Sequence, residues 1–180
     1  MQRLFSKFLA ALLLTTPLLV TTLHAQRQRD PLTNQESDEV ADLRDQPNPR
    51  IKLFQKFLQE RIDAIKTIGP NPVNDDRKAD LRAKYEEFTH ICDELQDNLD
   101  TFDEAHADIR KSLKDLIPAV AKWTAVLNQA APDRTYDFSR KTALDSVQSA
   151  GQEAQAMYKS QKEYFAKHKD ERGKNGTGPS

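Results

Sequence analysis

The amino-acid sequence predicts an all-α fold, and its composition and periodicity are the observations behind this prediction. The chain of 180 residues has only five glycines and is rich in Ala, Leu, Lys, Glu, Gln, Asp and Arg, which are typical of helices. No segment alternates apolar and polar residues as a half-buried strand does. Apolar residues instead recur every three or four positions. We therefore expect an elongated antiparallel helical bundle or hairpin around one long central helix, with a coiled-coil-like seam of 3.5-residue period.

The first element is a secretory signal peptide over residues 1–25. A short basic start is followed by mostly apolar residues 8–20, and Ala25 offers a small residue for cleavage. The apolar run is too short for a permanent membrane anchor. We therefore expect a mature chain that begins near Gln26, has no stable membrane anchor, and works in the periplasm or as a secreted protein.

The mature chain is long enough for one domain, which we place at residues 26–168. Residues 169–180 are charged, rich in glycine and without an apolar anchor, so we expect a disordered tail. Positive and negative charges are nearly balanced, 27 against 28 in the whole chain, and they are mixed along it. This balance predicts no nucleic-acid partner. Because Cys92 is the only cysteine, it forms no internal disulfide and stability must come from packing.

Two helix starts precede the central helix. Thr33 followed by Glu36 fits a capping box, so a short helix is predicted to begin there and to end before Pro47. Asn48, followed by proline, is the second start signal, and Gly69 ends this first core helix. The apolar positions of the first core helix fall at helical spacing: Ile51, Phe54, Leu58, Ile62 and Ile65.

The long central helix is predicted to follow a cap at Asn74 or Asp75 and to run for roughly 55 residues, about 80 Å. Steps of four and three alternate along its seam over 47 residues, the period of a left-handed supercoil. His106 is the only clearly polar residue on this seam, and Pro118 predicts a kink near residues 114–118. The seam consists of Leu81, Tyr85, Phe88, Cys92, Leu95, Leu99, Phe102, His106, Ile109, Leu113, Leu116, Val120, Trp123 and Leu127.

The last helix is predicted from about Thr135 to about His168. The small residues of its seam near Gly151 would let another helix approach closely. From the helix lengths, we expect the first core helix to fold back along the N-terminal half of the central helix and the last helix along the C-terminal half. Such a rod is thin, which leaves open a homodimer or a bend into a compact bundle. The seam of the last helix consists of Leu144, Val147, Gly151, Ala154, Tyr158, Gln161 and Phe165.

Histidines that follow an acid by three residues are the candidates for a metal site. Di-iron bundles use such pairs because the two side chains share one helix face. Here the two pairs lie on one helix about 24 Å apart, too far for a single site. We therefore predict no metal site and interpret Cys92 as a buried hydrophobe and His106 as a polar core residue that sets the register. The weighed metal candidates are Glu87, His90, Cys92, Asp103 and His106.

Catalytic motifs are absent from the sequence. There is no glycine loop for phosphate, no Gly-x-Ser-x-Gly, no His-Glu-x-x-His and no Cys-x-x-Cys-His for haem. The many acids, on helices that also carry Lys and Arg, indicate a solvated and salt-bridged face. We therefore predict no catalytic residues, no cofactor and no enzyme activity.

Short motifs in residues 30–45, in Arg50-Ile51-Lys52-Leu53-Phe54 and in Arg61-Ile62-Asp63-Ala64-Ile65 resemble a group of exported bacterial helical proteins. The resemblance covers most of the mature chain and implies an exported helical protein, without implying an activity. Leu32-Thr33-Asn34-Gln35-Glu36 is also similar to the Leu-Thr-x-x-Gln motif of small periplasmic helical chaperones. One copy is present and its last position is Glu36, so the capping box suffices to explain it.

The sequence therefore favours an exported, non-enzymatic helical protein that acts through protein–protein contacts, as a scaffold or as a chaperone-like envelope factor. A chaperone-like binder needs an exposed apolar groove, for which Ile91, Ile117 and Val126 are the candidates. The alternative is a helical bundle that binds a small ligand or a metal through His106, Cys92 and the acids around His90.

Overall fold

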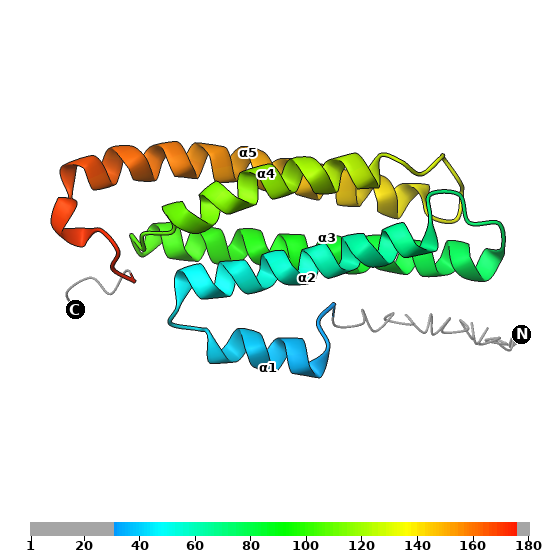
Figure 1. Cartoon of the computed structure of the whole chain (residues 1–180), viewed down its shortest axis with the longest axis horizontal. Coiled ribbons are helices and arrows are strands. Elements are labelled where there is room, and N and C mark those ends of the chain that lie inside the picture. The colour runs from blue at the N-terminus through cyan, green and yellow to red at the C-terminus, as the bar shows by residue number, and fades with distance from the viewer. Residues whose placement is uncertain (1–30, 176–180) are drawn as a thin grey trace, which may run out of the picture.

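The computed structural model describes residues 31–175, and all regular secondary structure in this range is helical, which confirms the all-α prediction (Figure 1). The predicted signal peptide and its cleavage site lie outside the described residues. Within them, no helix has the length and apolar character needed to cross a membrane. The elements are α1 (Asn34–Asp42), α2 (Pro47–Ile68), α3 (Asp75–Glu104), α4 (Arg110–Leu127), α5 (Asp137–Lys167) and a one-turn 3-10 helix η1 (Lys169–Glu171).

Helices α2 to α5 form an elongated four-helix bundle (Figure 1). Helix α2 packs against α3 and α4, and α5 packs against the same two helices, so α3 and α4 occupy opposite corners. Each of these helices runs antiparallel to the next one in the chain, and the short α1 lies outside the bundle beside α2. The expected antiparallel bundle is therefore present in its compact form.

The prediction of one long central helix is wrong at one place. Helix α3 ends at Glu104 and α4 begins at Arg110, and the turn between them sends α4 back along the bundle. The chain does not break near Pro118, because α4 continues through that residue. A straight helix would leave much of a two-helix seam in water. The turn instead lets α4 bury its seam against α2 and α5, which the hydrophobic effect favours.

The seam residues fill the core of the bundle. Except for His106, every residue assigned to the seam of the predicted central helix is buried, and so are the apolar positions predicted for α2. Trp123 of α4 packs edge-to-face on Phe88 of α3, with ring centroids 6.1 Å apart. Its indole N–H also donates to Gln59 Oε1 of α2 at 2.9 Å. One aromatic side chain therefore ties three helices together.

The small-residue section of α5 allows the expected close approach of another helix, which is α4. A β-carbon placed on Gly151 would lie 2.7 Å from Cγ1 of Val120, closer than side chains pack. Ala150 and Ala154, on either side of this glycine, are buried as well. Glycine is therefore needed at this position for α4 and α5 to pack at this distance.

Helix α1 is fixed to the bundle by a buried ion pair. The capping box is confirmed: Thr33 Oγ1 accepts from the Glu36 backbone N–H, and the Glu36 carboxylate accepts from the Thr33 N–H at 2.7 Å. The same carboxylate accepts hydrogen bonds from both terminal nitrogens of Arg61 in α2, with Nη2 at 2.8 Å from Oε2. Burial is the largest single influence and disfavours the charged carboxylate, but the hydrogen bonds from Arg61 and Thr33 and the positive charge of Arg61 together outweigh it and lower the pKa of Glu36 to about 2.

The start of α2 differs from the prediction, because Asn48 does not cap its own helix. Helix α2 begins at Pro47, and Asn48 lies in its first turn. The Asn48 side chain instead accepts from the Ser112 hydroxyl at 2.7 Å and from the Ser112 N–H, and it donates to the Asp108 carbonyl at 2.8 Å. It therefore caps the first turn of α4 from across the bundle.

The structure describes the first part of the predicted disordered tail, residues 169–175. Residues 169–171 form η1, and the following residues return to the turn between α3 and α4. Gly173 N–H donates to Asp108 Oδ2 at 2.9 Å, and Asp108 N–H donates to the Lys174 carbonyl at 3.1 Å. The expectation of disorder therefore fails for residues 169–175, and residues 176–180 lie outside the described part of the chain.

Candidate functional site

The five metal candidates are not brought together by the fold. Glu87 binds Lys84 at 2.7 Å and Arg61 at 3.2 Å, and the Cys92 side chain is fully buried in the core. Asp103 and His106 lie at the end of the bundle, several turns away from His90. Within residues 31–175, no group of three or more His, Cys, Asp and Glu side chains is arranged to hold a metal ion.

Cys92 has the environment of a core residue. Burial raises the pKa of its thiol to about 12, although a hydrogen bond with Ser146 lowers it somewhat. A thiol with this pKa stays neutral at physiological pH, so it lacks the thiolate that nucleophilic or metal-binding cysteines need.

His106 does not lie on a helical seam, which corrects the register predicted for it. It is exposed in the turn after α3, with a φ of 54°, in the left-handed region that non-glycine residues rarely adopt. Its ring stacks on Tyr164 of α5 with centroids 4.6 Å apart, and Tyr164 stacks in turn on His168 at 4.1 Å. The His106 ring therefore packs on the surface of α5 at this end of the bundle.

Gln161 of α5 holds the turn from inside the bundle. Its amide N–H₂ donates to Asp103 Oδ1 at 2.8 Å and to the Ala107 carbonyl at 3.1 Å, and its Oε1 accepts from the Ile109 N–H at 3.2 Å. The side chain is 3 % exposed. Its hydrogen bonds therefore satisfy backbone groups that a helix break would otherwise leave unpaired.

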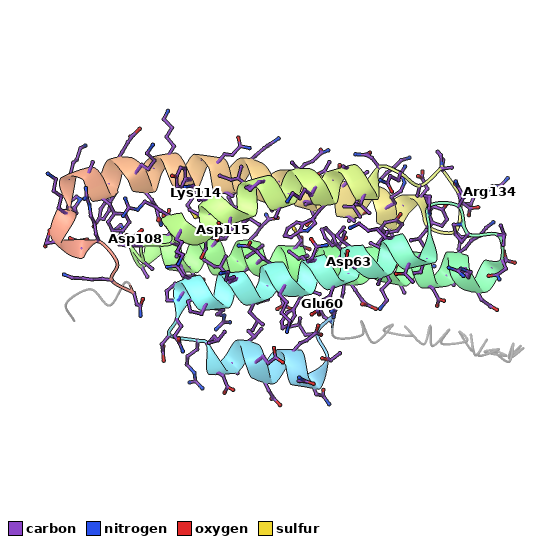
Figure 2. All side chains as sticks on the ribbon, in the orientation of Figure 1. Glu60, Asp63, Asp108, Lys114, Asp115 and Arg134 are labelled. Atoms are coloured by element: carbon purple, nitrogen blue, oxygen red, sulfur yellow. The ribbon has the colours of Figure 1, made fainter. Side chains whose placement is uncertain are left out.

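A shallow pocket opens between this turn and α5, at the end of the bundle that Asp108 marks in Figure 2; Arg134 marks the other end. Its polar groups are mostly engaged with one another, as the contacts of Gln161 show. The pocket is lined by Asp103, His106, Ser160, Gln161, Tyr164 and Phe165.

The backbone of His106 gives a test of the corrected register. We expect His106→Gly to be about 1 kcal/mol more stable than His106→Ala, because alanine keeps the steric cost of the left-handed conformation and glycine does not. Both variants lose the stacked ring, so their difference reports the backbone alone. Urea unfolding measures it. The opposite order, alanine above glycine, would show that His106 is helical and would restore the continuous seam.

The apolar groove expected of a chaperone-like binder is not formed by its candidate residues. Ile91 is fully buried, and Ile117 and Val126 are partly buried against the core. In the described part of the chain the exposed large apolar side chains are Val73 and Phe138. Two isolated residues of this kind do not make a groove.

Carboxylates that face solvent are the most distinctive feature of the surface. Residues 85–109 contain nine acids and neither Lys nor Arg. Asp93, Asp97, Asp100 and Glu104 follow one another at steps of four, three and four, so they share one face of α3, and all four are exposed. Together with Glu153 of the neighbouring α5, we call them the acidic surface.

The acidic surface is not the salt-bridged face that the sequence predicted. Among the described residues, none of its five carboxylates takes part in an ion pair. Asp93 Oδ1 accepts from the Ser146 hydroxyl at 2.7 Å, which links α3 to α5 without adding a positive charge. Like charges one turn apart destabilise a helix by a few tenths of a kcal/mol per pair, so α3 is folded against its own charge repulsion here.

Glu153 is the member of the acidic surface that lies between the two helices. Burial, together with a hydrogen bond and charge repulsion from Asp100, raises the pKa of Glu153 to about 7. Gln96 lowers it slightly through a hydrogen bond, and Asp97 raises it further. Burial is the largest of these causes, and the side chains that act on this carboxyl, Asp100, Gln96 and Asp97, all belong to α3.

Comparisons of the chain with protein-family models, with curated proteins and with solved structures found no match.

Proposed function

We propose that this chain is an exported, non-enzymatic protein that works by binding a cationic partner protein through the acidic surface. The observation that carries the proposal is the row of unpaired carboxylates on α3. Four of them lie within twelve residues, about 17 Å along the helix, and no Lys or Arg occurs between positions 85 and 109.

Unpaired charge of one sign supports a role in recognition. Such a surface draws an oppositely charged partner by long-range attraction and repels phosphate-rich molecules, so it favours a Lys- or Arg-rich protein over a nucleic acid. A partner helix with basic residues at steps of three and four would match the spacing of Asp93, Asp97, Asp100 and Glu104. This chemistry fits a scaffold better than a chaperone, because chaperone binding would need exposed apolar area.

Export remains part of the proposal and rests on the sequence alone. The basic start, the apolar run and the small residue before Gln26 support it. The intact mass of the protein recovered outside the cytoplasm tests it, since cleavage near Gln26 removes a defined mass.

A charge-neutralised variant tests the binding surface. We expect a labelled helical peptide with lysines on one face to bind the native chain at low salt, and D93N/D97N/E104Q to weaken it about tenfold. This is the effect of losing three exposed ion pairs at a few tenths of a kcal/mol each. Fluorescence anisotropy at low and high salt measures the affinity, with a Glu-substituted peptide as the negative probe.

The matched control is D38N/D42N/D80N, which removes three exposed carboxylates elsewhere and causes the same change in net charge. We expect this control to bind the lysine peptide as the native chain does. Equal weakening of both variants would mean that only net charge matters, and the acidic surface would lose its assigned role. Absence of binding to the native chain at low salt would contradict the proposal outright.

A further inference from the structure

The shallow pocket between the α3–α4 turn and α5 contains two hydrogen-bond acceptors that the bundle does not use. Gln161 donates to Oδ1 of Asp103 at 2.8 Å, and Oδ2 of the same carboxylate receives no hydrogen bond from the described residues. Ser160, exposed on α5, also lines the pocket, and its hydroxyl makes no hydrogen bond within residues 31–175. The pocket therefore presents a carboxylate oxygen and a hydroxyl oxygen to a molecule that enters it.

The last turns of two parallel helices meet at this pocket. Asp93 is hydrogen-bonded to Ser146, and further along both helices Asp103 is hydrogen-bonded to Gln161, so α3 and α5 run in the same direction (Figure 1). Helix α3 ends directly after Asp103, and α5 ends about two turns after Gln161. The carboxyl-terminal end of a helix carries partial negative charge, so both helices favour a cation at this place.

The negative charge of the pocket is not neutralised by the protein itself. Among the described residues, Asp103 takes part in no ion pair. Arg110 lies over the ring of Phe165, which lines the pocket, at 4.7 Å from its centroid. Its guanidinium is already paired with Asp108 at 2.6 Å. The carboxylate of Asp103 is therefore available to a cation from outside the chain.

The size of the pocket limits what can enter it. Its volume is about 90 Å³. One water molecule needs roughly 10–15 Å³ of such space, so the pocket has room for the end of a side chain. Pockets that enclose a whole small molecule are several times larger, about 300–1,000 Å³. The rings of Tyr164 and Phe165 supply apolar surface for the carbon atoms of that side chain.

We propose that this pocket binds the ammonium group of a lysine side chain from the cationic partner. The ammonium donates to Oδ2 of Asp103 and to the hydroxyl of Ser160, and its methylene groups lie against Tyr164. A guanidinium binds a carboxylate best through both oxygens, and Gln161 already occupies one of them, so lysine fits better than arginine. The inference rests on the proposed function, because it places one residue of the same partner beside Glu104, where the acidic surface ends.

A titration with Nα-acetyl-lysine methylamide tests the pocket without any partner protein. We expect saturable shifts in the nitrogen-15 NMR spectrum at the amides of His106 and Ser160 of the native chain. The norleucine derivative, which lacks the ammonium, should cause none of them, and the arginine derivative should cause weaker ones. Ser160→Leu fills the pocket from an exposed helical position without changing the charge, and it should abolish the lysine shifts.

Three results of this titration would overturn the inference. The first is the absence of saturable shifts in the native chain, which does not depend on any variant folding. The second is the same set of shifts with the norleucine derivative, because binding would then not involve the ammonium. The third is shifts of equal size with the arginine derivative, because the pocket would then not select lysine.

The lysine peptide gives a second test, in which D103N removes the charge of the pocket and keeps an amide oxygen that can accept from Gln161. We expect D103N to weaken peptide binding about threefold. This loss should persist at high salt, because a partly buried ion pair is screened less than the exposed row on α3. The matched control is D115N, which removes an exposed carboxylate of α4 and should bind the peptide as the native chain does.

The two probes separate this inference from the proposed function. If the lysine derivative binds in the pocket but the peptide does not bind at low salt, the proposed function fails and the pocket stands. If D93N/D97N/E104Q weakens peptide binding and D103N does not, the pocket is overturned and the acidic surface stands. Equal weakening by D103N and D115N would also overturn the pocket, because only net charge would then matter.

Discussion

Replacement of Arg61 by methionine should lower the free energy of unfolding by about 3 kcal/mol. Arg61 is buried, and its guanidinium holds both oxygens of Glu36, the Pro31 carbonyl at 2.9 Å and Glu87 at 3.2 Å. Methionine keeps most of the packing volume but leaves the Glu36 carboxylate buried without its partner. Removing one member of a buried ion pair typically costs 3–5 kcal/mol. Undocking of α1 limits the loss here, because it returns Glu36 to water.

Three further measurements make this prediction specific to the ion pair. The control Lys56→Met removes an exposed lysine that pairs loosely with Glu39 and Glu60, and it should change stability by less than about 0.5 kcal/mol. The double variant Glu36→Gln with Arg61→Met should be more stable than Arg61→Met alone, because it leaves no unpaired charge. Hydrogen exchange in α1 should accelerate in Arg61→Met and not in the control.

The loss of stability at low pH should depend on the same Glu36–Arg61 ion pair. The pKa of Glu36 is lowered to about 2 from an ordinary value of 4.5, so the ion pair stabilises the native fold above about pH 4.5. This stabilisation is lost as the pH falls from there toward 2. In Arg61→Met the loss over this range should be much smaller. An equal acid response in both chains would show that Arg61 does not hold the carboxylate as described.

Periodicity predicted the interior of this fold because burial alone decides those positions. Apart from His106 in the turn, the alternation of four and three from Leu81 to Leu127 marks residues that are buried, whether α3 or α4 carries them. The same holds for Phe165 at the end of the last seam. A pattern of this kind records which side of a helix faces the core, and it stays in phase across a short turn.

The helix break at residues 105–109 could not be predicted from the residues around it, because the apolar spacing continues through the break. Phe102, His106 and Ile109 keep the four-three spacing through the turn, and no glycine or proline occurs between Phe102 and Arg110. What stabilises the break is distant in sequence: Gln161 from α5 and Asn48 from α2 supply hydrogen bonds to the turn and to the first turn of α4. Tertiary partners of this kind cannot be read from the residues of the turn itself.

The candidate site was partly visible in the sequence. The acids of residues 85–109 are obvious there, but their apparent balance by Lys and Arg elsewhere suggested salt bridges. Only the fold shows that, among the described residues, the five carboxylates of the acidic surface form no ion pair and that Glu153 from α5 belongs with them. The sequence marks His106 as the polar residue of the central seam. The polar side chain that hydrogen-bonds to the turn is instead Gln161, which lies on the seam of the last helix.

Replacement of Gln161 by leucine should lower the free energy of unfolding by about 3 kcal/mol. The variant leaves the Ile109 N–H and the Ala107 carbonyl without their side-chain partner in a buried turn, and each unsatisfied group costs about 1–3 kcal/mol. The apolar contacts that leucine gains offset part of this. Gln155→Leu, at an exposed position of α5, is the matched control and should change stability by less than about 0.5 kcal/mol.

Hydrogen exchange shows where the Gln161→Leu loss arises. The Ile109 amide should exchange faster in the variant even under conditions where amides at the centre of α3 keep their protection, because the turn opens before the bundle unfolds.

The pH dependence of the stability of Gln161→Glu gives a second test of these hydrogen bonds. Its carboxylate can accept from Ile109 but cannot donate to Ala107, and it lies against Asp103, so this variant should recover stability as acidification protonates it. If Gln161→Leu is as stable as the native chain, the turn holds its shape without the amide. The break between α3 and α4 would then follow from the burial of the α4 seam alone.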